Sequence, residues 1–142
     1  MDIKGSIVTI DAMGTQRVIA EKIVKNGGDY ILSVKGNQGS LEEEVQTTCK
    51  RTRPVLESCV VEKGHGRMEI HRCEVFEKGF IVDFEKRWEN LTSVIKITSI
   101  REFANKTETQ ERFYINSLST QIVVLTNIFE IIGLSKIICI DA

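Results

Sequence analysis

The sequence has almost no proline, no long apolar run and no strong net charge. Its single proline and 10 glycines in 142 residues exclude collagen-like and proline-rich linker classes. No apolar run approaches the roughly 18 residues that a membrane span needs, and Asp2 and Lys4 interrupt any signal sequence. A net charge of −1 excludes a polybasic DNA wrapper and an acidic tail. We therefore expect a soluble, globular, cytoplasmic chain, and composition alone does not indicate its function.

The cysteines show neither a metal-binding nor a disulfide pattern. No C-x-x-C pair occurs, and the two histidines do not stand at zinc-finger spacing from any cysteine. Nothing marks the chain as secreted, so we expect buried free thiols in a reducing compartment. The four positions are Cys49, Cys59, Cys73 and Cys139.

The first 53 residues have an alternating strand and helix pattern. The β-branched run 6–10 ends in Asp11 and is typical of a strand that is buried on both faces. Residues 16–26 have apolar residues at helical spacing and end at a glycine pair, and residues 29–35 form the next apolar run. Strand, helix and strand within about 30 residues predict a βαβ unit. Ser40 has capping-box spacing to Glu43, so a second helix should begin there and end before Pro54.

After Pro54 the pattern changes to that of strands. We expect four of them, with turns at 64–66 and 105–106; the predicted strands are 55–62, 67–76, 91–101 and 111–118. Residues 119–142 show neither apolar residues at helical spacing nor the turn residues that normally bound strands. The predicted organisation is an α/β part over 1–53, a β-rich section over 54–118 and a divergent tail over 119–142.

Asp11 is the sharpest candidate for chemistry. In open α/β sheets, ligands bind at the carboxyl ends of the strands, and a carboxylate there can hold Mg²⁺ for phosphoryl chemistry. An unpaired carboxylate at the end of an apolar strand is also costly to bury. The alternative is that Asp11 caps the following turn or helix.

Two loops carry further polar candidates. Lys35, Gly36 and Asn37 follow the second predicted strand, on the same edge as Asp11, and lysine with amides suits contact with phosphate oxygens. His65 and Arg67 flank Gly66 at a predicted hairpin tip, where glycines allow close approach to a ligand. Ordinary loop chemistry explains the first segment equally well, and for the second a surface turn with incidental charge is the favoured alternative.

Several of these segments together resemble one family, the H-repeat-associated transposases of bacterial insertion sequences. Separate motifs at compatible spacing are more specific than any one of them, and the match spans roughly residues 3 to 118. The segments are IVTIDAMGTQ (7–16), IAEKI (19–23), GGDYILSVKGNQ (27–38), GHGRME (64–69) and FYINSL (113–118).

The resemblance implies a fold, an activity and a set of site residues. The fold would be α/β, a partial RNase H-like βαβ core with a β-rich insertion. An Asp-Asp-Glu triad holding two Mg²⁺ would cleave and transfer DNA strands in transposition. Asp11 matches the second aspartate, as catalytic residue and metal ligand, and Lys35, Asn37, His65 and Arg67 match positions that we assign to DNA contact. The implied partner is DNA at the transposon ends, with self-association as a further option and no membrane.

The departures from the family pattern also lead to expectations. The chain starts too close to Asp11 to include the strand that bears the first aspartate. Where the family continues with a motif carrying the glutamate, residues 129–140 read as an out-of-frame version, so we infer a frameshift and do not assign that role to Glu130. With one triad carboxylate, the chain should bind Mg²⁺ weakly and be inactive alone. The alternatives are a non-catalytic remnant that binds DNA or transposase, and a Mg²⁺ phosphohydrolase that uses Asp11.

Overall fold

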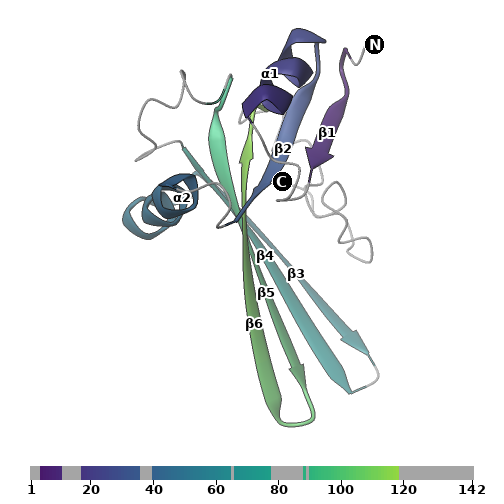
Figure 1. The fold of residues 1–142 in the computed structure, drawn as a ribbon. Coiled ribbons are helices and arrows are strands. Elements are labelled where there is room, and N and C mark those ends of the chain that lie inside the picture. The colour runs from purple at the N-terminus through teal and green to yellow at the C-terminus, as the bar shows by residue number, and fades with distance from the viewer. Residues whose placement is uncertain are drawn as a thin grey trace.

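The computed structural model describes residues 4–10, 17–35, 40–64, 66–77, 88 and 90–118. Within these ranges the chain is mixed α/β, with two helices and one six-stranded sheet (Figure 1). The α/β class expected from the sequence is therefore confirmed. The elements are β1 Ile7–Ile10, α1 Arg17–Lys25, β2 Asp29–Val34, α2 Ser40–Arg51, β3 Leu56–Gly64, β4 Arg67–Glu77, β5 Ser93–Phe103 and β6 Lys106–Asn116.

The first three elements form the predicted βαβ unit. Strands β1 and β2 pair in parallel, with Ile7 opposite Asp29. Helix α1 buries Ala20 and Ile23 and ends at a turn in which Gly27 has φ +86°. A Cβ at Gly27 would also lie 3.2 Å from the backbone of Lys4, so glycine is required here by both conformation and space. The glycine pair thus ends the helix as the sequence indicates.

Helix α2 ends at Arg51, before Pro54, as predicted. Leu41 and Val45 on its apolar side are fully buried, and Cys49 on the same side is half-buried. Acidic residues occupy its first turn and basic residues its last, and this arrangement complements the helix dipole.

Strands β3 to β6 form an antiparallel meander that continues the same sheet. The strand order is β1-β2-β6-β5-β4-β3, so β6 joins the meander to β2. Strand β6 starts at Lys106, five residues before the predicted start, because Ala104 and Asn105 form the hairpin turn by themselves. Both have positive φ, 46° and 63°, as a type I′ turn requires. The predicted turn at 105–106 is therefore wrong by one residue.

The sheet is buried on both faces near the helices. One face packs against α1 and α2, and Trp88 lies buried within this cluster. The opposite face carries a second cluster of apolar side chains. That second cluster contains Ile31, Val60, Cys73, Val75, Ile95, Ile97, Tyr114 and Leu118.

Buried and partly buried hydrogen bonds hold the end of β6 to its two neighbours, β2 and β5. The Ser117 hydroxyl accepts a hydrogen bond from the Tyr30 amide and donates one to Asp29 Oδ1, both at 2.9 Å. The Asn116 amide group is fully buried and donates to the carbonyl and hydroxyl oxygens of Ser93. These bonds satisfy polar groups that would otherwise be costly to bury.

Beyond the helices, the four meander strands project as an extension of the sheet (Figure 1). We call this extension the arm and define it by register as residues 60–64, 66–71 and 99–110. Most of its side chains are exposed, including all of those from Lys106 to Gln110. The arm therefore displays polar side chains on strands that are anchored elsewhere in the core.

Candidate functional site

The structure describes two of the five site residues expected from the sequence. Lys35 is exposed directly after β2, and Arg67 is the exposed first residue of β4. Asp11, Asn37 and His65 lie outside the described residues. Since β1 ends at Ile10 and runs parallel to β2, the chain leaves both strands at the same edge of the sheet.

Lys35 and Arg67 belong to different regions. Val34, next to Lys35, pairs with Phe113 of β6, whereas Arg67 lies level with Phe103 and Lys106 at the arm tip. The two levels are seven residues apart along β6, which is roughly 24 Å at about 3.4 Å per residue. The two side chains therefore do not form one compact site.

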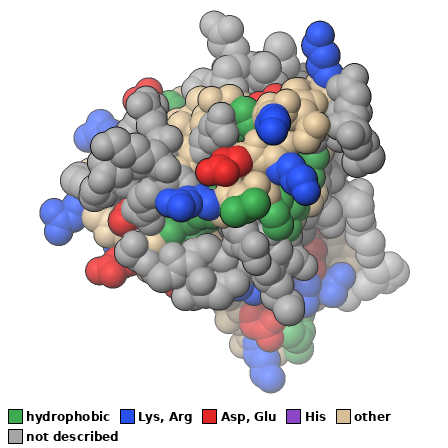
Figure 2. Space-filling view, turned by 45° about the horizontal axis from the view of Figure 1, so that its top comes forward, with side chains coloured by type: hydrophobic (Ala, Val, Ile, Leu, Met, Phe, Trp, Pro, Cys, Tyr) green, Lys and Arg blue, Asp and Glu red, His purple; other side chains and the backbone are tan. Residues whose placement is uncertain are grey.

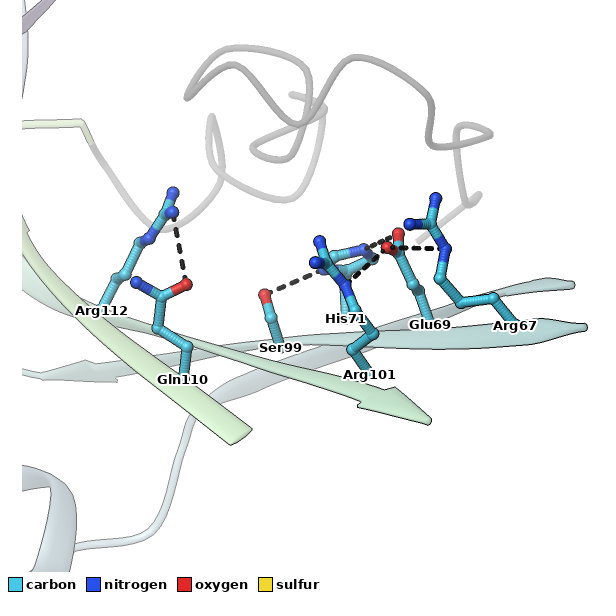
Figure 3. Close-up of polar contacts among 7 residues, drawn as sticks. All are labelled: Arg67, Glu69, His71, Ser99, Arg101, Gln110 and Arg112. Carbon is cyan, nitrogen blue, oxygen red and sulfur yellow. Dashed lines mark hydrogen bonds and ion pairs between the residues drawn. The ribbon is translucent and has the colours of Figure 1, made fainter. Parts of the chain in front are cut away.

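The arm brings together a polar cluster that sequence reasoning missed. Arg67, Glu69 and His71 alternate along β4 and point to the same face (Figure 3). Ser99 and Arg101 lie opposite them on β5, and Gln110 and Arg112 continue the row on β6. This face is continuous with the second apolar cluster, which ends at Val60, Cys73 and Ile97. The polar row therefore begins where the buried part of the face ends.

Glu69 is the centre of the cluster. Its Oε1 lies 3.0 Å from Arg101 Nε and 3.5 Å from Arg67 Nε, and its Oε2 lies 3.6 Å from His71 Nε2 (Figure 3). Burial raises the pKa of this carboxyl, but the guanidinium groups of Arg67 and Arg101, together with His71, lower it more, so the pKa lies below that of an ordinary glutamate. Glu69 is therefore a carboxylate at neutral pH.

His71 is buried and has contacts at both ring nitrogens. Nδ1 lies 2.9 Å from the Ser99 hydroxyl, and Nε2 faces Glu69. The side chain is 10% exposed. A hydrogen bond at one nitrogen fixes the ring orientation and thereby the direction of the other nitrogen. The imidazole is thus fixed in place beside a carboxylate.

Glu62 completes the cluster from the neighbouring strand. It lies directly opposite Glu69 in the β3–β4 register, and its Oε1 is buried without a hydrogen-bond partner. One ligand atom from each of Glu62, Glu69 and His71 lies within 4.8 Å of the others, so the three could hold a metal ion. The pairing of Gly64 with Arg67 sets Glu62 opposite Glu69, and the alternation of β4, which the sequence does contain, sets His71 on the same face.

The cysteines are only in part as expected. Cys49, Cys59 and Cys73 are free thiols. Burial raises the pKa of Cys49 and Cys73 to about 12, and the Glu74 carboxylate acts in the same direction on both. Lys96 opposes the rise at Cys49, and a hydrogen bond with Ser58 opposes it at Cys73. Cys59 is exposed, so its predicted burial is wrong. Cys59 lies on β3, the last strand of the described sheet. Its side chain is on the opposite face of the sheet from that of Cys73, and so points away from the second apolar cluster.

The surface shows no separation of charge in the view of Figure 2. Lys and Arg side chains of the described residues are interspersed there with Asp and Glu side chains. Among the described residues, neither helix is long and apolar enough to cross a membrane. The mixed surface agrees with the net charge of −1.

Comparison with curated proteins shows related sequences over most of the chain. The chain is 41% identical over 128 residues to the H repeat-associated putative transposase YhhI of Escherichia coli K12, and equally similar to the putative protein YbfL of that strain. Both matches cover 82% of the chain. It is 45% identical over 91 residues, 59% of the chain, to the H repeat-associated putative transposase YbfD. The chain spans about a third of the length of these relatives, with shares of 33%, 33% and 35%.

Two further comparisons add little. No protein-family profile matches the chain. A solved structure, the sugar N-methyltransferase KedS8 from Streptoalloteichus, aligns with 88% of this chain and 47% of its own at a TM-score of 0.36 and 9% identity. That similarity is too low to identify a fold. The sequence matches nevertheless confirm the resemblance to H-repeat-associated transposases.

Proposed function

We propose, on the premise that this chain is a relative of the H repeat-associated putative transposases, that it is part of a transposase catalytic domain. The identity of 41% to YhhI over 82% of the chain is the observation that carries this proposal. In this proposal residues 1–53 contribute part of an RNase H-like core, and residues 54–118 form a β-rich insertion. The reaction of the whole domain would be Mg²⁺-dependent cleavage and transfer of DNA strands.

The arrangement of β1 and β2 supports this proposal. The strands are parallel, and Asp11 and the segment from Lys35 to Asn37 follow them in the sequence. In open α/β sheets such positions lie where ligands bind. We assign Asp11 to Mg²⁺ binding, and Lys35 and Asn37 to contact with DNA phosphates.

The arm offers a second place for DNA contact. The side chains of Arg67 and Arg101 are 49% and 50% exposed, and Arg112 lies on the same face of the sheet. Guanidinium groups bind phosphate well because their donors form a planar fork. We assign Arg67 and the neighbouring His65 to DNA backbone contact. Since the surface charge is mixed, binding should depend on these few contacts rather than on a general positive field.

This polypeptide alone should not cleave DNA. Two-metal catalysis needs several carboxylates that converge on ions about 4 Å apart. Asp11 is the single residue here that matches a triad position. Because Mg²⁺ keeps its waters unless the site is well organised, one aspartate should hold it weakly.

A binding assay and a cleavage assay test the two parts of the proposal separately. Binding to labelled duplex DNA is measured by fluorescence anisotropy across a series of salt concentrations. For Arg67→Ala we expect weaker binding at every DNA sequence and a salt slope smaller by about 1, as for one lost phosphate contact. Lys25→Ala, which removes an exposed charge from α1, is the matched control and should leave the slope unchanged.

Each part has an outcome that contradicts it. If the wild-type chain does not bind DNA at low salt, or if Lys25→Ala has the same effect as Arg67→Ala, the assigned DNA contact is wrong. If Mg²⁺-dependent strand cleavage occurs and is lost in Asp11→Ala, the expected inactivity is wrong. Hydrolysis of small phosphate esters that is lost in Asp11→Ala would instead support the phosphohydrolase alternative.

A further inference from the structure

We propose that Glu62, Glu69 and His71 form a binding site for a transition-metal ion, with Zn²⁺ as the ion that fits best. The three residues come from the paired strands β3 and β4, and their ligand atoms lie within 4.8 Å of one another. The site lies on the arm and does not depend on Asp11 or on transposase activity. The names of the related putative transposases do not refer to such a metal site.

The first argument comes from Glu62. Its Oε1 is buried and has no hydrogen-bond partner, although a buried carboxylate oxygen normally has one. The carboxylate that stands directly opposite it is Glu69, and like charges opposite each other destabilise a sheet. A bound cation would supply the missing partner of Glu62 and remove the repulsion between the two strands.

The second argument comes from the geometry of His71 and Glu69. Their facing atoms, Nε2 and Oε2, are 3.6 Å apart, which is long for a hydrogen bond. Two ligands of one tetrahedral Zn²⁺, at 2.0–2.1 Å each, stand about 3.4 Å apart. The observed separation therefore needs only a small adjustment for both atoms to bind the same ion.

The surrounding side chains support the same role. Metal-binding histidines usually donate the N–H of the other ring nitrogen to a neighbouring acceptor, and Ser99 Oγ lies 2.9 Å from His71 Nδ1. Arg101 Nε lies 3.0 Å from Oε1 of Glu69, on the oxygen that does not face His71. Ser99 and Arg101 thus orient the two ligands, and Oε2 of Glu69 is the oxygen on the side of His71.

The ligand types select the kind of ion. A nitrogen and two carboxylates suit Zn²⁺ and similar first-row ions, whereas Mg²⁺ prefers oxygen ligands and retains its waters. Three protein ligands would leave one coordination position for water. The positive charges of Arg67 and Arg101 beside Glu69 also repel a cation, so we expect moderate affinity rather than the tight binding of a structural zinc site.

Calorimetric titration of the full chain with Zn²⁺, after removal of metal by a chelator, tests the proposal. We expect one Zn²⁺ per chain and no comparable binding of Mg²⁺. Glu62→Gln, which keeps the shape of the side chain, should weaken Zn²⁺ binding more than about tenfold. Glu57→Gln, which changes an exposed carboxylate on the other face of β3, is the matched control and should bind as the wild type does. Circular dichroism confirms that both variants fold.

Co²⁺ distinguishes this site from adventitious binding at a thiol. Co²⁺ bound by Glu and His absorbs in the visible range without the near-ultraviolet charge-transfer band of a thiolate ligand. The titrations are repeated with Cys59→Ser, because Cys59 is an exposed thiol on the same strand. The proposal is overturned by an absence of Zn²⁺ binding, by equal affinities of Glu62→Gln and wild type, or by loss of binding in Cys59→Ser.

Discussion

The two ends of the meander strands have the same backbone pairing but different surroundings. Near the helices, Ser93, Val94 and Ile95 of β5 are buried, whereas Arg101 and Glu102 of the same strand are exposed. Strand β6 has the same gradient, from exposed residues at Lys106 to buried ones at Asn116. The same strands thus continue, with unbroken pairing, from a core that is packed on both faces of the sheet into the largely exposed arm.

The two regions differ in which side chains they carry, and this suggests different roles in folding and in binding. The inner part of the meander, residues 56–59, 72–77, 93–98 and 111–116, has apolar side chains packed on both faces of the sheet. The arm instead carries the charged cluster around Glu69 and the exposed arginines. We infer that the inner part supplies most of the folding free energy and that the arm carries residues whose role is binding.

The largest expected difference is in thiol reactivity, between the two faces of the sheet at neighbouring positions just inside the arm. Cys59 is exposed, whereas Cys73 is buried on the neighbouring strand with a pKa raised from 9.0 to about 12. A shift of that size lowers the thiolate fraction near pH 8 by roughly a thousandfold. Alkylation followed by mass spectrometry should therefore label Cys59 long before Cys73. Equal rates for the two would show that the inner part is not closed to solvent.

The next largest effect is on stability. Ile95→Ala should lower the free energy of unfolding by about 2–5 kcal/mol, because the side chain is fully buried and a cavity would remain. Ile100→Ala on the same strand lies in the arm and is partly exposed, so its cost should be less than half as large. Urea unfolding measures both changes. Similar losses in both variants would mean that the arm contributes to the core as much as the inner part does.

The smallest effect is expected at the arm tip. Ala104 has φ +46° in the first position of the hairpin turn, where glycine is favoured over alanine. Ala104→Gly should therefore stabilise the chain, by about 0.5 kcal/mol after the larger entropy of unfolded glycine is included. Thermal unfolding gives the size and sign of the change. A destabilised variant would indicate that the turn is not strained.

The helices and strands could be predicted well because local signals define them. The glycine pair after α1 and Pro54 after α2 gave both helix ends to within one or a few residues. The parallel pairing of β1 and β2 followed from the spacing of strand, helix and strand. The start of β6 was missed because exposed polar residues from Lys106 to Gln110 have no hydrophobic alternation, and hydrogen bonding to β5 determines their conformation.

The candidate site was harder to predict because it depends on pairing between strands. Arg67 was identified from a glycine-rich motif, but the sequence analysis did not predict that Glu62, Glu69 and His71 lie together beside it. Their proximity depends on the register of β3 against β4, in which a shift of one residue would move Glu62 to the other face. The exposure of Cys59 was missed for the same reason, since sequence alone does not show which face of a terminal strand is covered.

The pairing of β6 with β2 has a consequence for how the chain folds. The meander hairpins join neighbours in the sequence, but Ser117 meets Asp29 and Tyr30 across 88 and 87 residues. Closing such a long loop is entropically costly and slow relative to hairpin formation. The meander should therefore assemble early, and its attachment to the βαβ unit should limit the rate of folding.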